Sequence, residues 1–371
     1  MKRYLTGIFL LLGLLFLAGC GREVQMERFE QTFFDTFDTV VRVIYYAESE
    51  EKAEEYGAHV HSRFLELHKK FDGYHTYEDQ MSLMEVNQLA GQGKVALDPE
   101  LYDLIELSLE RYDNYGVTNI AIGPVTDVWH EYRDGHVVGL DVQEEVQEGK
   151  VAELPPMELL EEAAKHSLRE NIVLYPEEHA VEIKDPLGKI DLGAVAKGYA
   201  TELVAKELEE MGVTAALISA GGNVRIIGTP PEADRKYFGI GLQDPDAATG
   251  LEPEAENMID QLYINDTSVV TSGDYQRFYV VDGKLYHHLI DPMTLFPADH
   301  FRAVTIVTED SGLADFLSTT AFCLPYEESR ALVESLDGVE AYWIHRDGSV
   351  TFTEGLSKNL KSQGATNQEA A

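Results

Sequence analysis

A carboxylate and a hydroxyl stand four residues apart in residues 311–322, a segment whose apolar residues recur at helical spacing. Asp315 and Thr319 therefore lie on one face of the expected helix. Carboxylate and hydroxyl oxygens are hard ligands of the kind that Mg²⁺ accepts while it keeps positions open for water and substrate phosphates. A structural alternative stays open, in which Thr319 bonds to its own helix backbone and Asp315 interacts with the helix dipole.

A histidine precedes an acid by three residues at the end of an expected strand, in the run from His287 to Pro292. His288 can take up a proton near neutral pH, so it is a candidate base that activates a hydroxyl nucleophile, with Asp291 close by in sequence. The chain has twelve histidines, and most histidines in proteins are structural or solvated. The spacing alone therefore leaves the role of His288 open.

Three glycine-containing turns follow apolar segments. Residues 190–199 read as a strand end that turns into a helix, whose N-terminus and Lys197 suit a phosphate or an anionic flavin edge. In residues 219–223 and 271–274, glycines allow a close backbone approach to a ligand and hydroxyls can bond phosphate oxygens. Ordinary turn chemistry explains each segment equally well. None matches a P-loop or the dinucleotide-binding fingerprint.

These residues must be positioned by a mixture of helices and antiparallel strands. Periodicity and turn signals predict strands over 39–45, 172–175, 180–183, 215–219 and 237–242, and hairpins that turn at Asp282-Gly283 and Asp347-Gly348. They predict helices over 53–71, from Asp98 and Pro99 toward Gly116, and over 156–170, 195–211 and 311–322. Residues 133–155 and 243–258 are expected to be surface segments without regular structure. Hairpins mixed with helices favour an α+β fold over a doubly wound parallel sheet.

Composition excludes several classes of protein. The 371 residues, 44% of them hydrophobic, are enough for a large core, and high aromatic content argues against disorder. There are 29 basic and 66 acidic residues, giving a formal net charge of −37. A surface this acidic repels nucleic-acid phosphates, so DNA and RNA are not expected as partners.

The first twenty residues are typical of a bacterial lipoprotein signal. Lys2 and Arg3 precede an apolar run to Leu17, and Leu17-Ala18-Gly19-Cys20 resembles a lipobox. A plain signal peptide or a buried anchor is the alternative. We expect a signal peptide over 1–19, lipidation of Cys20, a tether over 20–31, one domain over 32–355 and a flexible tail over 356–371. The protein would then be held by its lipid on the extracytoplasmic face of the cell membrane.

Five motifs occur in order along the chain and are similar to those of the FAD:protein FMN transferase (ApbE) family. Residues 191–200 resemble the family's D-L-G-G-I-A-K-G-Y-A, and residues 219–223 resemble A-G-G-[DN]. Residues 271–275 resemble T-S-G-D-Y, residues 288–292 resemble H-I-I-D-P, and residues 314–321 resemble A-D-A-L-S-T-A-L. Together they span nearly all of the chain after Cys20 and are far more specific than any one motif.

The resemblance implies a reaction and a set of site residues. FMN would move from FAD onto a serine or threonine hydroxyl of a partner protein as a phosphoester, with release of AMP. His288 would take the hydroxyl proton, with Asp291 as its orienter or substitute. Mg²⁺ would be held by Asp315, Thr319 and the carbonyl oxygen of Ala194, with assistance from Ser318. Flavin or adenosine contacts would come from Phe37, Tyr74, Val117, Thr118, Asn119, Asp191, Lys197, Gly222, Ser272 and Ile290. Family members are α+β proteins with two packed halves and a nucleotide cleft between them.

The chain also departs from the family pattern. The family's early M-G-T is replaced by Phe37-Asp38-Thr39, and its G-A-F-D is replaced by the sequence of residues 116–119. Its S-E-x-S-x-x-N stretch is only partly kept in residues 81–87, and its glycine after D-P-x-T is replaced by Leu295. These departures concern the flavin pocket and the acceptor groove more than the metal site. Phe37 stacks on the flavin ring or packs as a core aromatic, and the sequence does not separate the two.

Two other functions fit the same motifs. If water took the place of the acceptor hydroxyl, the protein would be an Mg²⁺-dependent FAD pyrophosphatase that yields FMN and AMP. If it had no catalytic activity, it would be a lipoprotein that binds flavin. The expected acceptor carries a Ser/Thr-Gly-Ala-Thr-like motif and belongs to a membrane redox complex. The chain's own residues 362–366 faintly resemble that motif, so self-modification at Thr366 is an alternative to a disordered end.

Overall fold

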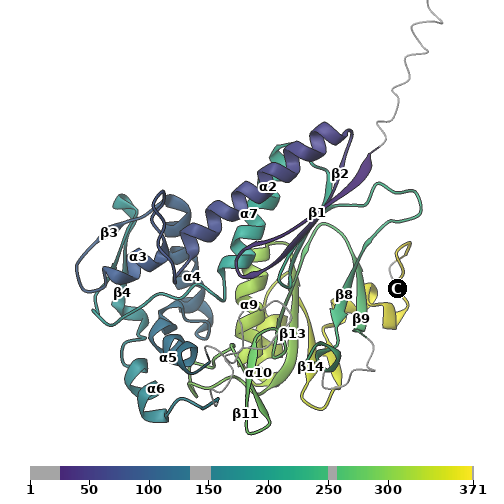
Figure 1. The fold of residues 1–371 in the computed structure, drawn as a ribbon. Coiled ribbons are helices and arrows are strands. Elements are labelled where there is room, and N and C mark those ends of the chain that lie inside the picture. The colour runs from purple at the N-terminus through teal and green to yellow at the C-terminus, as the bar shows by residue number, and fades with distance from the viewer. Residues whose placement is uncertain (1–25, 134–151, 250–256, 370–371) are drawn as a thin grey trace, which may run out of the picture.

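An eight-stranded antiparallel sheet forms the centre of the computed structural model, which describes residues 26–133, 152–249 and 257–369 (Figure 1). Every strand pair in it is antiparallel, as expected for the α+β class. In sheet order the strands are β1 Glu27–Thr36, β2 Thr39–Ala47, β6 Ala215–Ala220, β7 Asn223–Gly228, β10 Ser268–Gly273, β13 Phe301–Thr308, β14 Glu340–His345 and β15 Val350–Phe352.

The sheet is covered on both faces, which explains why its central strands are hydrophobic almost throughout. On β13, Val304 and Ile306 belong to the larger core cluster, whereas Ala303 and Val307 belong to a second cluster on the opposite face. The first face carries α2 Glu50–Phe71, α7 Ala196–Glu210, α9 Ser311–Cys323 and α10 Tyr326–Glu334. The second carries the hairpin of β8 Phe238–Gln243 and β9 Met258–Ile264, with α8 Pro245–Thr249 between them.

A smaller half lies beside the sheet, at the left of Figure 1. It contains α3 Leu83–Gln88, α4 Pro99–Tyr115, η1 Ile120–Ile122, α5 Gly123–Arg133, α6 Met157–Ala164, η2 Arg169–Asn171 and η3 Pro176–Glu178. It also contains a three-stranded sheet of β3 Val95–Ala96, β5 Ala180–Ile183 and β4 Ile172–Tyr175. A two-stranded ribbon, β11 Phe278–Val281 and β12 Lys284–His287, extends from the main sheet, and its Tyr279 packs with Trp129 and Leu160 of this half.

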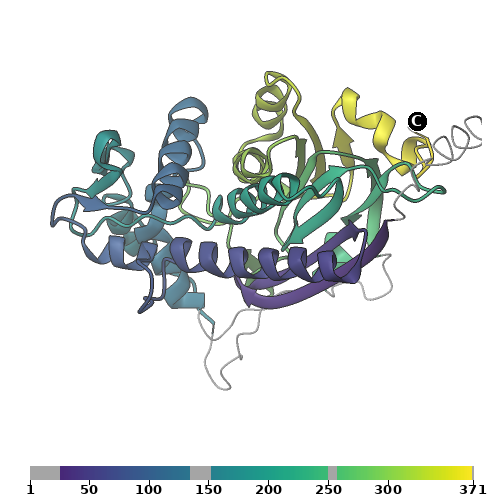
Figure 2. The same ribbon diagram turned by 90° about the horizontal axis from the view of Figure 1, so that it is seen from above.

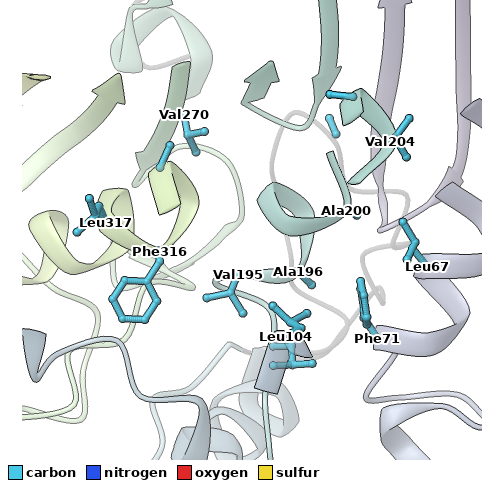
Figure 3. Close-up of a cluster of buried hydrophobic side chains, with 14 of the residues drawn as sticks. Leu67, Phe71, Leu104, Val195, Ala196, Ala200, Val204, Val270, Phe316 and Leu317 are labelled. Carbon is cyan, nitrogen blue, oxygen red and sulfur yellow. The ribbon is translucent and has the colours of Figure 1, made fainter. Parts of the chain in front are cut away.

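The two halves share one hydrophobic core. Helix α2 runs along the length of the molecule, as Figure 2 shows, and packs against both. Figure 3 shows where the halves meet: Phe71 of α2 and Leu104 of α4 face Ala196 of α7, with Phe316 of α9 nearby. Such burial makes the halves one folding unit and holds the N-terminus of α7 at a fixed place between them.

Two predicted boundaries are wrong. The expected tether over 20–31 includes the first half of β1, in which Glu27 pairs with Ala47 and Gln31 with Val43. Its polar side chains are those of an exposed sheet edge, which hides the strand in the sequence pattern. The expected flexible tail over 356–371 is ordered as far as the structure describes it, through η4 Glu354–Asn359 and η5 Lys361–Gln363, because Leu356, Leu360 and Ala365 are buried.

Most of the other predicted elements are present. Helix α4 has Asp98 as its N-cap and Gly116 in the left-handed conformation at its end, and the β11–β12 hairpin turns at Asp282-Gly283. The helix expected over 156–170 is shorter, and α8 lies within the expected loop over 243–258. Residues 1–19, Cys20 and 134–151 lie outside the described residues. Among the helices that the structure describes, none is long and apolar enough to cross a membrane.

Candidate functional site

The expected metal residue Asp315 is buried where α9 crosses the start of α7. The backbone N–H of Gly198 donates a hydrogen bond to Asp315 Oδ2 at 2.8 Å. A Cβ atom at position 198 would lie 2.4 Å from Asp315 Cβ and 2.4 Å from the carbonyl oxygen of Ser311. Glycine is therefore required for the two helices to approach so closely. This contact between residues far apart in sequence carries no local signal, and sequence reasoning missed the role of Gly198.

Three hydroxyls gather beside Asp315. Ser272 Oγ at the end of β10 lies 2.8 Å from Ser318 Oγ and 3.3 Å from Thr319 Oγ1, and Ser318 Oγ donates to the carbonyl oxygen of Asp315. Thr320 Oγ1 also bonds back to the α9 backbone, where it donates to Phe316 O at 2.9 Å. Among the described contacts, Thr319 Oγ1 is bonded to Ser272 and not to the backbone of α9, so the alternative in which Thr319 bonds to its own helix finds no support.

Asn223 supplies one more oxygen to this group. Its side chain hydrogen-bonds Asp315, while Asn223 Oδ1 is buried without a hydrogen-bond partner. Burial raises the pKa of Asp315, and the charge of Lys197 and the Gly198 N–H oppose that rise. A buried carboxylate, an orphaned amide oxygen and neighbouring hydroxyls are hard donors that fit Mg²⁺, which needs only one or two carboxylates. No group of three or more His, Cys, Asp or Glu side chains suited to a metal occurs in the described residues.

The turn from Asp191 into α7 is fixed by its own carboxylate. Asp191 Oδ1 accepts from the Gly193 N–H at 2.8 Å, and Asp191 Oδ2 accepts from Thr126 Oγ1 of α5 at 2.7 Å. Helix α7 has no side-chain cap, and Lys197 Nζ reaches back to Gly193 O at 3.3 Å. The half-buried Ala194 lies within this turn. The turn is therefore held in shape from the smaller half, and at the helix start the Gly198 N–H is already bonded to the Asp315 carboxylate.

Asn87 is a second residue that the sequence reasoning did not assign. Its amide donates to Ile190 O at 2.9 Å and accepts from the Ile190 N–H at 2.8 Å. These two bonds join α3 to the segment that leads into Asp191. Asn87 is the last residue of the partly kept S-E-x-S-x-x-N stretch, so the family pattern held the signal that could have found it.

His288 and Asp291 are not paired. His288 Nδ1 lies 3.3 Å from the carbonyl oxygen of Arg277. Asp291 Oδ1 accepts from the Met293 N–H and Asp291 Oδ2 from Thr294 Oγ1, so this carboxylate shapes its own turn. Burial, then the charge of Arg277, holds the pKa of His288 well below its usual value, so the ring is neutral at neutral pH and can accept a proton.

The remaining expected contacts fall into two groups. Tyr74 is 49% exposed, with its ring near His130 and 5.1 Å from Lys189 Nζ, and so it is available to a ligand. The side chains of Val117, Thr118, Asn119 and Ile290 are engaged within the protein: Val117 and Ile290 pack in hydrophobic clusters, Thr118 bonds to Thr320, and Asn119 caps η1.

Gly222 and Phe37 both have left-handed backbone. Gly222 has φ 91° and its carbonyl oxygen accepts from the Thr271 N–H. Phe37 has φ 54° in the β1–β2 turn, and its ring packs edge-on against Phe64 and His68 of α2. The structure thus places Phe37 as a packed aromatic.

Thr366 lies in the ordered end of the chain. Thr366 Oγ1 accepts from the N–H groups of Gln368 and Glu369, and the neighbouring Asn367 O accepts from the N–H groups of Lys236 and Tyr237 beside β8. The hydroxyl therefore serves a local turn, and the described contacts do not join it to His288 or Asp315. This arrangement gives no support to self-modification.

A shallow hollow between α2, α4 and α7 lies apart from the motif residues. It is lined by side chains that include Arg63, Lys70, Glu100 and Glu207. Arg63 bonds to Glu100 and Glu207, and Lys70 bonds to Glu100. Because its cations are already paired, the hollow is a surface ion-pair network rather than a second binding site.

Comparison with known proteins agrees with this geometry. The model of the ApbE family matches residues 37–343. An FAD:protein FMN transferase of Treponema pallidum is 30% identical, with 92% of this chain and 91% of the relative covered, and one of Klebsiella pneumoniae is 30% identical over 78% and 83%. The crystal structure of the ApbE protein from Thermotoga maritima, 28% identical, superimposes with a TM-score of 0.72 over 89% of this chain and 98% of that one. A match over most of the chain, together with motif residues that meet at one site, shows that this protein belongs to the ApbE family.

Proposed function

We propose that this protein transfers FMN from FAD onto a serine or threonine hydroxyl of a partner protein and releases AMP in a Mg²⁺-dependent reaction. The observation that carries the proposal is the junction of α7 and α9, where Gly198 admits Asp315 to the N-terminus of a helix beside three hydroxyls and an orphaned amide oxygen. FAD:protein FMN transferases of similar length are its relatives.

Asp315, Thr319, Ser318 and the carbonyl oxygen of Ala194 would hold the Mg²⁺. When bound, the ion neutralises phosphate charge and polarises phosphorus, which an acidic protein needs in order to bind a diphosphate. The protein's own contribution is to keep these oxygens in place. The Gly198 N–H and the Asn223 amide fix the Asp315 carboxylate, and Ser272 fixes the hydroxyls of Ser318 and Thr319.

His288 would act as the base. A neutral imidazole removes the proton of the acceptor hydroxyl as its oxygen attacks the FMN phosphorus, and the bond from that phosphorus to the oxygen of AMP breaks. The proton stays on His288 and AMP leaves with the bonding electron pair. The charge of Lys197, in the first turn of α7, would favour binding of the phosphates. On the side of the smaller half, Tyr74 and Asp191 would contact the FAD.

We also propose that the protein is anchored by lipid on Cys20 on the extracytoplasmic face of the membrane. Glu27, the first residue of β1, follows Cys20 by seven residues, which span at most about 25 Å. Such a short link would keep the domain near the membrane surface. An acceptor with a Ser/Thr-Gly-Ala-Thr-like motif in a membrane redox complex would be within reach.

The test is a transfer reaction with the full chain in detergent. The protein is incubated with FAD, Mg²⁺ and a protein that carries a Ser-Gly-Ala-Thr segment, and the intact mass of the acceptor is measured. We expect a gain equal to FMN, with equimolar AMP. AMP without a gain in mass would show hydrolysis of FAD, and FAD bound unchanged would show a binding protein; either result contradicts the proposal. Asp315→Asn is the matched control, because it keeps the shape of the side chain and removes its charge.

A further inference from the structure

The carbonyl oxygen of Arg277 contacts His288 at two points, its backbone N–H and its imidazole ring. Arg277 lies between β10 and β11, and its carbonyl oxygen accepts from the backbone N–H of His288 at 3.2 Å. The same oxygen lies 3.3 Å from His288 Nδ1. A carbonyl oxygen can only accept, so the proton of the neutral ring must be on Nδ1. His288 Nε2 is then the nitrogen with a free electron pair.

The side chain of Arg277 ties this carbonyl to the first hairpin of the sheet. Arg277 Nη2 donates to the carbonyl oxygen of Asp38 at 2.7 Å. Asp38 and Phe37 form the β1–β2 turn, in which both residues have left-handed backbone, with φ of 48° and 54°. The guanidinium is thus bonded to a tight turn, and the carbonyl oxygen that accepts the hydrogen bond from His288 Nδ1 belongs to the same residue.

The charge of Arg277 is not paired with a carboxylate in the part of the chain that the structure describes. The chain has 66 acidic and 29 basic residues, yet within residues 26–133, 152–249 and 257–369 no ion pair joins Arg277 to a carboxylate. After burial, the largest influences on the pKa of His288 are the charges of Arg277 itself, His287 of β12, Lys197 of α7 and Arg133 of α5, all of which lower it. The nearest acid along the chain, Asp291, is engaged in its own turn.

We propose that Arg277 is the positioning residue of His288: its carbonyl oxygen fixes the ring with Nδ1 protonated and Nε2 free, and its guanidinium holds that carbonyl against the Asp38 turn. The role that a carboxylate plays beside the histidine of a hydrolase triad is here filled by a peptide carbonyl. A carbonyl sets the tautomer and favours a positive charge on the ring less strongly than a carboxylate does, and the guanidinium opposes that charge. The catalytic consequence rests on the proposed role of His288 as base.

The tautomer is measured without substrate. In the full chain with ¹⁵N-labelled histidine, two-bond ¹H–¹⁵N correlations distinguish the two neutral tautomers, and loss of one ring system in His288→Asn assigns the signal. We expect the form with Nδ1 protonated, well populated at pH 7. A His288 ring protonated at Nε2, or already positively charged at pH 7, overturns the proposal before any variant of Arg277 is made.

Three variants test the side chain. Arg277→Gln removes the charge and shortens the link to Asp38, so the His288 ring should titrate at higher pH and its tautomers should mix. Arg277→Lys keeps the charge, so the titration should stay close to that of the wild type. Lys284→Gln removes an exposed charge from the same hairpin and is the matched control, with no expected change. An unchanged titration and tautomer in Arg277→Gln would refute the role of the side chain.

The same variants separate this proposal from the proposed function. In the transfer assay, Arg277→Gln should lower kcat/KM by at most about fourfold near pH 6 and much less near pH 9, since burial still keeps the pKa of His288 from rising above its ordinary value and only the neutral ring is a base. If His288→Asn retains near-normal transfer, the role of His288 as base fails, while the tautomer and titration measured without substrate still decide the role of Arg277.

Discussion

The substitution Gly198→Ala tests whether the contact between α7 and α9 sets the geometry of the site. A Cβ atom there would lie 2.4 Å from both Asp315 Cβ and Ser311 O. Ordinary contacts of this kind are about 3.5 Å, so the helices must separate by about 1 Å. Overpacking of this size costs about 1–3 kcal/mol, and the better helix propensity of alanine returns about 1 kcal/mol. The net loss of stability should therefore be only about 1 kcal/mol.

The effect on transfer should be far larger than the effect on stability. A displacement of about 1 Å at a group that positions a reacting phosphate costs about 100-fold in rate. The assay is the rate of FMN transfer at saturating FAD and Mg²⁺, measured beside the free energy of unfolding from urea titration. We expect the free energy of unfolding to fall by only about 1 kcal/mol while the transfer rate falls about 100-fold.

Gly312→Ala is the matched control, because it adds a methyl group to the same helix contact where there is more room. Its Cβ would lie 3.2 Å from Asp310 Oδ1 and 3.4 Å from Tyr199 Cα. We expect its transfer rate to remain close to that of the wild type. A Gly198→Ala protein that transfers FMN as fast as Gly312→Ala would refute the claim that this close approach places Asp315.

Four further predictions concern the metal residue, the metal, the core and acid stability. Asp315→Asn should lower transfer about 10³-fold, since the negative ligand is lost, while urea unfolding changes by about 1 kcal/mol or less. Chelation by EDTA should abolish transfer, and added Mg²⁺ should restore it better than Ca²⁺, whose preferred coordination is larger. Thr118→Val should cost about 1 kcal/mol in urea unfolding, because the 2.7 Å hydrogen bond to Thr320 is lost. Burial lowers the pKa of His287 to about 4, while its ring donates to Ala298 O and accepts from the Leu289 N–H. The unfolded chain therefore binds more protons between pH 6.5 and 4, so stability should fall by about 3 kcal/mol as the pH decreases through that range, and His287→Gln should lose most of this dependence.

Local patterns in the sequence were sufficient where a structural feature is local. Asp98 as N-cap, Pro99 after it and Gly116 at the far end determine the bounds of α4, and all three act within one turn of the chain. The Asp282-Gly283 turn likewise fixes the β11–β12 hairpin through residues that tolerate positive φ.

Features that depend on distant contacts could not be predicted in this way. Strand β1 is polar because it lies at the sheet edge, and β13 has no alternation because both its faces are buried. The bond from Gly198 to Asp315 and the pair of bonds between Asn87 and Ile190 join residues that only the fold brings together. The resemblance to the ApbE family pointed to Asp315 and Thr319 as candidate metal ligands, but not to Gly198 and Asn87.

Two departures from the family pattern place a side chain on left-handed backbone. Asp38 and Leu295 occupy positions where the family has glycine, and both have left-handed backbone, with φ of 48° and 61°. An L-residue with a side chain can adopt this conformation at a cost of about 1–2 kcal/mol, and aspartate does so more readily than leucine. At Gly198 the obstacle is not a dihedral angle but the backbone and side chain of a neighbouring helix, which cannot move without moving Asp315. At positions 38 and 295 only backbone strain opposes a side chain, whereas at position 198 a side chain would displace Asp315.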